Sequence, residues 1–177
     1  MTGTDESADP ERSGGEPPDA AGRSGVRGAL ARLRAKSGED VPESLDPDVV
    51  LWQLEQFTAR VTRKHGAGSV QSARARMELS VQLGAMRRWD EACRLRADSY
   101  ATFCGVGGDG SPEALRTELS LAVALAHAGR WDEADGHLTR AASVSVASLG
   151  PDDEVSVLAR DRLDEFRRGR PDGVQQA

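Results

Sequence analysis

The chain contains no asparagine and no isoleucine, and its only lysines are Lys36 and Lys64. Arginine therefore supplies nearly all of the positive charge, a bias that we interpret as the codon usage of a high-GC bacterial genome. The only cysteines are Cys93 and Cys104, too few to hold a small scaffold together by disulfides. We expect both to be reduced thiols.

Long apolar runs are also missing. No stretch approaches the roughly 20 apolar residues that a membrane-spanning helix needs. The first ten residues have neither the basic start nor the apolar core of a secretory signal. These absences predict a cytosolic protein with no membrane span.

The net charge of −6 is unevenly distributed along the 177 residues. Residues 1–48 hold 11 acidic and 6 basic side chains, whereas residues 49–177 hold 18 and 17. The larger part of the chain is nearly neutral. This argues against a general nucleic-acid binder, because neutralising phosphates needs a surplus of basic side chains.

The beginning of the chain has the composition of a disordered acidic arm, which we expect over residues 1–46. Residues 1–24 are rich in Gly, Pro, Ser, Asp and Glu and cannot bury enough apolar surface to offset the entropy of ordering. Within this arm, residues 25–36 form a short basic amphipathic segment. Either this segment contacts nucleic acid or an acidic surface, or it is only a weakly helical part of the arm. Residues 169–177 are expected to be a flexible tail.

An internal repeat is the most informative feature of the chain. Arg-Trp-Asp-Glu-Ala at residues 88–92 recurs at residues 130–134, forty-two positions later. The same offset pairs Leu83 with Leu125 and Gly108 with Gly150. A repeat of this period indicates a supersecondary unit that stacks on copies of itself.

Apolar residues at helical spacing predict an all-α domain over residues 47–168. Asp46-Pro47 is a good helix start, and Gly129 is placed to end a helix. No stretch shows sustained strand alternation. The expected helices cover residues 47–64, 69–85, 89–104, 111–128, 131–148 and 152–168.

Residues 111–141 resemble a tetratricopeptide repeat. The resemblance rests on residues 111–117, Leu121-Ala122, residues 129–134, Leu138 and Ala141. The forty-two-residue period, with residues 149–152 between units, resembles the longer kinesin-light-chain type. It covers residues 69–168 and implies a right-handed α–α superhelix of about six helices.

The resemblance also implies where small residues are needed and where the stack ends. Helices cross closely at Ala122, Ala134 and Ala141, and the first copy has Ser80, Ala92 and Ser99 there. Helix 47–64 then corresponds to the second helix of a truncated unit. Asp164 and Arg167 are charged where small and apolar residues are expected, so helix 152–168 reads as a polar cap.

In this family the first helix of each hairpin lines a concave face, so the resemblance implies a binding site for a partner protein or peptide there. The matched residues are Arg74, Met77, Glu78, Val81, Ala85, Arg116, Leu119, Ser120, Val123 and His127. Two arginines beside apolar residues suit a partner with apolar anchors and acidic residues. The alternative is that the apolar members belong to the hairpin core and the arginines are merely solvated.

No residues converge on a metal, cofactor or catalytic site. His65, His127 and His137 do not have ligand spacing with the cysteines, and Cys93 reads as a small buried residue. The acidic pairs 90–91 and 132–133 read as helix-start residues. We therefore expect neither enzymatic activity nor a cofactor.

The sequence favours a non-enzymatic adaptor that binds another protein on the concave face. One alternative is a self-associating scaffold, for which an exposed Trp52 on the first helix would be an anchor. The other is a regulator whose basic segment, residues 23–36, contacts nucleic acid or an acidic surface.

Overall fold

The computed structural model describes residues 46–169. The predicted arm of residues 1–46, its basic segment 25–36 and the predicted tail lie outside the described residues, except for Asp46 and Gly169 at the boundaries. What we predicted for them stays a prediction.

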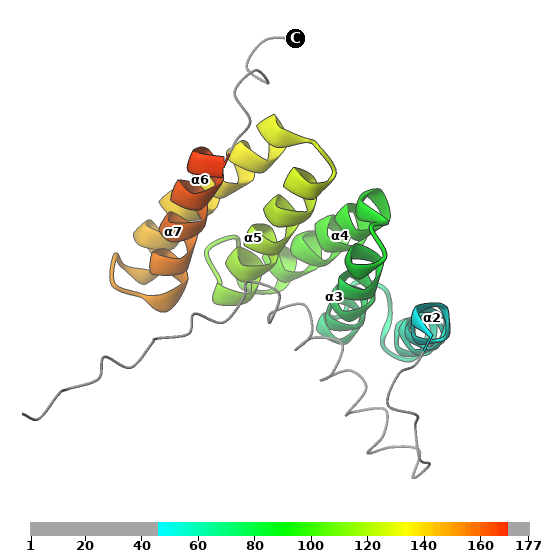
Figure 1. Ribbon diagram of the computed structural model, residues 1–177. Helices are drawn as coiled ribbons and strands as arrows, with labels where there is room; N and C mark the ends of the chain where they lie inside the picture. Colours follow the sequence, from blue (N-terminus) through cyan, green and yellow to red (C-terminus); the bar gives the residue numbers. More distant parts are fainter. Residues whose placement is uncertain (1–45, 170–177) are drawn as a thin grey trace, which may run out of the picture.

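The described part of the chain is an all-α superhelical arrangement (Figure 1). Each helix packs against the next, and the chain proceeds from α2 at one end to α7 at the other. The six helices are α2 (Pro47–His65), α3 (Val70–Ala85), α4 (Trp89–Gly107), α5 (Pro112–His127), α6 (Trp131–Leu149) and α7 (Glu154–Gly169). They confirm the six predicted helices, with boundaries that differ by a few residues.

Three connections between hairpins have the same construction at intervals of forty-two residues. Gly66, Gly108 and Gly150 follow α2, α4 and α6 with φ angles of 84°, 81° and 95°. Glycine adopts this left-handed region without the steric cost of a Cβ. Each glycine N–H donates back to a carbonyl of the last helical turn. The forty-two-residue repeat of the sequence therefore corresponds to a repeat of the backbone conformation at these connections.

A polar cap three residues after each of these glycines starts the next helix. The Ser69 and Ser111 hydroxyls accept from backbone N–H groups of α3 and α5, at 3.2 and 3.3 Å. Asp153 at the third connection accepts from the Val155 N–H at 2.8 Å. These caps satisfy donors that the first turn of a helix leaves free.

The small residues at the expected close crossings of helices are fully buried. Ala92 and Ala134, Ser80 and Ala122, and Ser99 and Ala141 all have no exposed surface. The charged counterparts at the end of the stack are exposed: Asp164 faces solvent, and Arg167 donates to Asp135 and Thr139 of α6. The interpretation of α7 as a closing helix agrees with this placement.

Trp89 and Trp131 occupy equivalent environments. Each begins the second helix of a hairpin and contacts a ring from the first helix of the next hairpin. Trp89 stacks on His127 with ring centroids 4.4 Å apart, and Trp131 lies 5.6 Å from Phe166. The repeated pentapeptide therefore marks the same junction twice.

The turns inside the two hairpins have different residues at the position with positive φ. Gly129 has φ 78°, and the corresponding residue, forty-two positions earlier, is Arg87 with φ 60°. Both turns have the same closing bond, in which Arg88 N–H donates to Leu83 O and Arg130 N–H donates to Leu125 O, each at 2.9 Å. Arg87 thus takes a left-handed conformation that costs a non-glycine residue about 1–2 kcal/mol.

We expect Arg87→Gly to raise the free energy of unfolding by roughly 0.5–1 kcal/mol, because relief of strain exceeds the added entropy of the unfolded chain. Urea denaturation monitored by circular dichroism measures the change. Gly129→Arg is the matched reverse substitution and should destabilise by a similar amount. A lower stability of Arg87→Gly would show that the turn is not strained.

Candidate functional site

We call the surface formed by the first helices of the two complete hairpins the α3/α5 face. Ala73 of α3 and Ala114 of α5 share one apolar cluster with Phe103 of α4, a helix that contacts both, and Met77 packs against this cluster. The ten residues predicted to bind a partner lie on these helices, five on each.

The structure separates these ten residues by exposure. Exposed members are Arg74, Ala85, Arg116, Val123 and His127, and half-buried members are Met77, Glu78, Val81 and Ser120. Leu119 is different, because it is only 5% exposed and belongs to the cluster that joins α5 to α6 and α7. The closing helix α7 covers this position, so Leu119 is a core residue and lends no surface to a partner.

The two predicted arginines differ in their surroundings. Arg116 donates to Glu154 of α7 at 3.1 Å, in an exposed ion pair of the kind that contributes little to stability. Among the described residues, Arg74 has no hydrogen-bond or ion-pair partner. Arg74 is therefore the more available of the two for an acidic partner.

The sequence analysis did not identify Arg96. It lies on α4, and its side chain forms hydrogen bonds to a residue of α3 and a residue of α5. Its Nε donates to the Ser80 hydroxyl at 3.1 Å, and its Nη1 donates to the Ser120 carbonyl at 2.8 Å. Burial lowers the pKa of this guanidinium. Alignment of the two repeats could have identified it, because the residue forty-two positions after Arg96 is the apolar Leu138, which indicates a core position.

A second polar cluster joins α4, α5 and α6 and was also missed. Glu118 is fully buried, and its Oε1 accepts from Arg140 Nε at 2.8 Å and lies 3.0 Å from His137 Nδ1. The Arg140 guanidinium lies 5.3 Å from the centroid of the Tyr100 ring and 3.6 Å from Asp109. This arrangement ties the two complete hairpins together through a buried charge.

Within the described residues, the cluster is incompletely satisfied, because Glu118 Oε2 and Arg140 Nη2 are buried without a hydrogen-bond partner. We expect Glu118→Gln to lower the free energy of unfolding by about 2 kcal/mol, since the neutral amide removes the buried negative charge that faces the Arg140 guanidinium. Urea denaturation of Glu113→Gln, an exposed acid on the same helix, is the control. Equal stability of the two variants would exclude an energetic role for the buried carboxylate.

The thiols are not poised for nucleophilic chemistry. Burial raises the pKa of the Cys93 thiol and also that of Cys104, for which nearby Asp109 and Glu118 act in the same direction. A raised pKa disfavours the reactive thiolate. Within residues 46–169, no three His, Cys, Asp or Glu side chains are grouped so that they could hold a metal ion.

The repeated acidic pairs lie at helix starts, as their spacing suggested. Glu91 accepts two bonds from Arg88 at 2.6 and 2.8 Å, and Glu133 accepts two from Arg130 at 2.6 and 2.7 Å. The hydrogen bond from Arg88 lowers the pKa of Glu91, and that from Arg130 lowers the pKa of Glu133. Each glutamate is thus held by its own helix and not aimed at a substrate.

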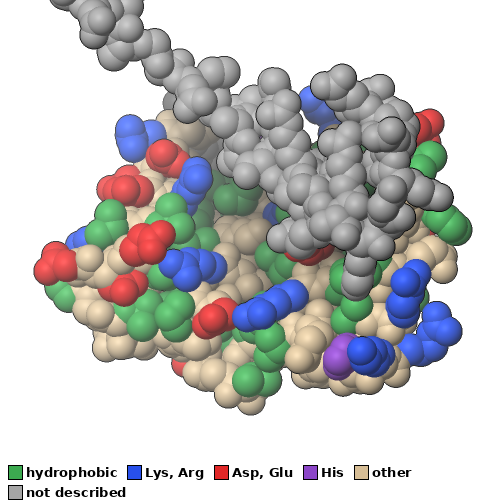
Figure 2. Space-filling model, turned by 90° about the horizontal axis from the view of Figure 1, so that it is seen from below, with side chains coloured by type: hydrophobic (Ala, Val, Ile, Leu, Met, Phe, Trp, Pro, Cys, Tyr) green, Lys and Arg blue, Asp and Glu red, His purple; other side chains and the backbone are tan. Residues whose placement is uncertain are grey.

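Charges of both signs are interspersed on the uncovered surface that Figure 2 shows, with hydrophobic side chains between them. This mixture agrees with the near-neutral composition of residues 49–177.

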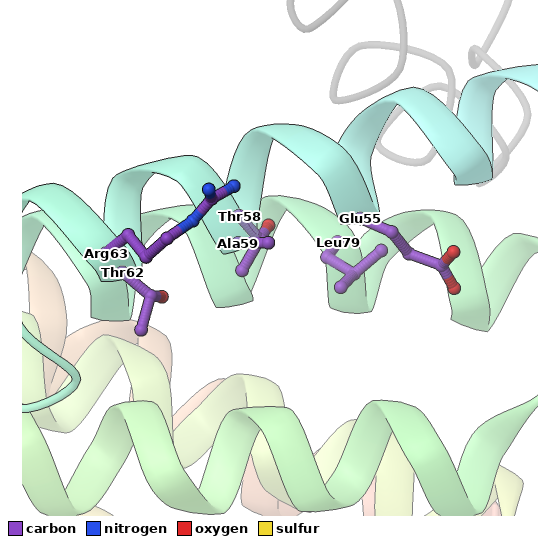
Figure 3. Close-up of a pocket in the computed structure, with 6 residues that line it drawn as sticks. All are labelled: Glu55, Thr58, Ala59, Thr62, Arg63 and Leu79. Atoms are coloured by element: carbon purple, nitrogen blue, oxygen red, sulfur yellow. The ribbon is translucent and has the colours of Figure 1, made fainter.

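An open pocket of about 620 Å³ lies away from the predicted site (Figure 3). Its lining is Glu55, Thr58, Ala59, Thr62 and Arg63 of α2 with Leu79 of α3. None of the ten predicted residues lines it, and the Thr58 hydroxyl donates its proton to the Ala75 carbonyl. The pocket is mostly apolar and lacks the convergent polar groups of a ligand site.

Comparison of the chain with protein-family models and with curated proteins finds no match to either. None of the helices in residues 46–169 is long and apolar enough to cross a bilayer.

Proposed function

We propose that the protein is a non-enzymatic cytosolic adaptor that binds another protein through the α3/α5 face, and that its hairpins are tetratricopeptide repeats of the kinesin-light-chain type. The repeated junctions at Trp89 and Trp131 and the fully buried small residues support the repeat assignment.

The observation that carries the binding proposal is the mixed character of the α3/α5 face. Val123 is 39% exposed and Val81 is half-buried, while Arg74 and Arg116 extend into solvent on the same two helices. Apolar side chains left at a surface beside arginines suit a partner helix or extended peptide with apolar anchors and acidic residues.

The direct test is recovery of a partner from a lysate of the source cells on immobilised protein. We expect the double variant Arg74→Glu/Arg116→Glu to recover about tenfold less of it, because two like charges would face the acidic partner. The double variant Arg60→Glu/Arg94→Glu, at exposed positions of α2 and α4 outside the face, is the charge-matched control. Undiminished recovery by the folded double variant would remove the α3/α5 face from the proposal.

Self-association is the second candidate, and one observation favours it. Trp52 on α2 is 60% exposed, and Val49 beside it is also exposed, although Leu51 and Leu54 of the same helix are buried. A large aromatic side chain open to solvent at the end of a stack is a natural anchor for a second copy.

If α2 mediates a dimer, light scattering of the full chain at high concentration should give twice the monomer mass, and Trp52→Glu should restore the monomer by placing a charge in the interface. Lys64→Gln, which changes the charge by the same amount at an exposed position about three turns further along α2, should leave the dimer intact. A monomeric wild-type protein would reject this candidate.

A further inference from the structure

Arg96 occupies a position that the second hairpin uses for its hydrophobic core. It is only 7% exposed, and its counterpart Leu138 is 2% exposed in the cluster that joins α5, α6 and α7. Placing a guanidinium where an alkyl side chain packs requires removal of its hydration. The first hairpin therefore keeps a charge at a position where the fold alone would favour leucine.

Neutral groups provide the bonds that Arg96 makes. The Ser80 hydroxyl donates to the Met77 carbonyl at 2.7 Å and so presents a lone pair to Arg96 Nε. The Ser120 carbonyl accepts from Nη1. No carboxylate of the described residues forms an ion pair with Arg96. The charge is thus oriented by two hydrogen bonds but has no counter-ion there.

The side chain extends from α4 toward both α3 and α5, since one hydrogen bond reaches each of these helices. Its third nitrogen, Nη2, has no hydrogen bond to a described residue. The half-buried Ser120 and the partly exposed Val81 and Val123 belong to the same face. This buried cation therefore keeps N–H donors that no described residue uses, between a residue of α3 and a residue of α5.

We propose that Arg96 is the carboxylate receptor of the α3/α5 face and takes the side-chain carboxylate of an Asp or Glu from a partner segment. The inference rests on the proposed function and names the residue that recognises the acidic side chain. Apolar side chains of the same segment pack on Val81 and Val123. A bond to a charged donor that is already held in place is stronger and loses less conformational entropy than a bond to an exposed arginine.

A single acidic side chain suits this site better than a phosphate group. Two of the five guanidinium N–H groups are bound and the side chain is only 7% exposed, so this site suits one carboxylate, whereas phosphate groups are usually held by donors from several residues.

The test uses the full chain and peptides of about 14 residues, near the length at which isolated helices begin to form. Each peptide is N-acetylated and C-amidated, so that it has no terminal carboxylate, and has leucines at helical spacing beside one Glu or a matched Gln. Fluorescence anisotropy gives the affinity, and the NMR signals of Arg96 Nε–H and of the Val81 and Val123 amides report the place of binding. We expect a Glu peptide to bind at least tenfold more tightly than its Gln partner.

Arg96→Leu should abolish this preference for Glu, and Arg94→Leu, an exposed arginine on the same helix, should retain it. Arg96→Leu introduces the residue of the second hairpin, so we expect a melting temperature equal to or above that of the wild type. Arg96→Met serves as a second variant if the branched side chain does not fit.

Equal binding of Glu and Gln peptides at the α3/α5 face would overturn the role of Arg96 and leave the proposed function standing. No change in any of these signals at peptide concentrations of about 1 mM would also overturn it, while partner recovery decides the proposed function separately. The acidic side chain that Arg96 binds could instead come from the acidic beginning of the same chain, and a synthetic peptide of residues 1–22 tests this alternative. If the peptide of residues 1–22 bound through Arg96 more tightly than every Glu peptide, the carboxylate would come from the chain itself and not from a partner.

Discussion

Close approach of neighbouring helices at fully buried alanine and serine residues is the constraint on which the whole stack depends. Ala92 and Ala134 have no exposed surface, and neither do Ser80 and Ala122 at the facing positions. Side chains of this size let helices pack at short distances, and larger ones would separate the hairpins. The positive-φ glycines then return the chain at a fixed interval, so that each hairpin presents its first helix beside that of the previous one.

The two hairpins share this framework and differ in their buried polar residues. Leu138 fills the core of the second hairpin, whereas its counterpart in the first is Arg96. Glu118 is buried in the second, whereas its counterpart Arg76 donates to Ala67 O and Thr102. Buried charge is costly wherever an apolar residue would fit. Such departures from the repeat are therefore more informative about function than the repeated residues, which the fold itself requires.

The sequence predicted the six helices and the equivalent positions of Trp89 and Trp131, because period, caps and small residues are local signals that agree with one another. It predicted the α3/α5 face less well. Leu119 is covered by α7, and burial by a helix thirty-five residues later leaves no trace in local spacing. Arg96 and Glu118 were passed over because a single charged residue in an amphipathic helix normally faces solvent. Only comparison of Arg96 with Leu138 would have shown that this charge occupies a core position.

The location of Arg96 also bears on how a partner would be selected. Exposed arginines such as Arg74 and Arg116 attract acidic segments over a distance, but salt screens them and their flexible side chains fix no register. A guanidinium fixed by Ser80 and Ser120 can accept an acidic side chain at one place only. The exposed arginines would then attract the acidic segment, and the buried Arg96 would fix the position at which the segment binds.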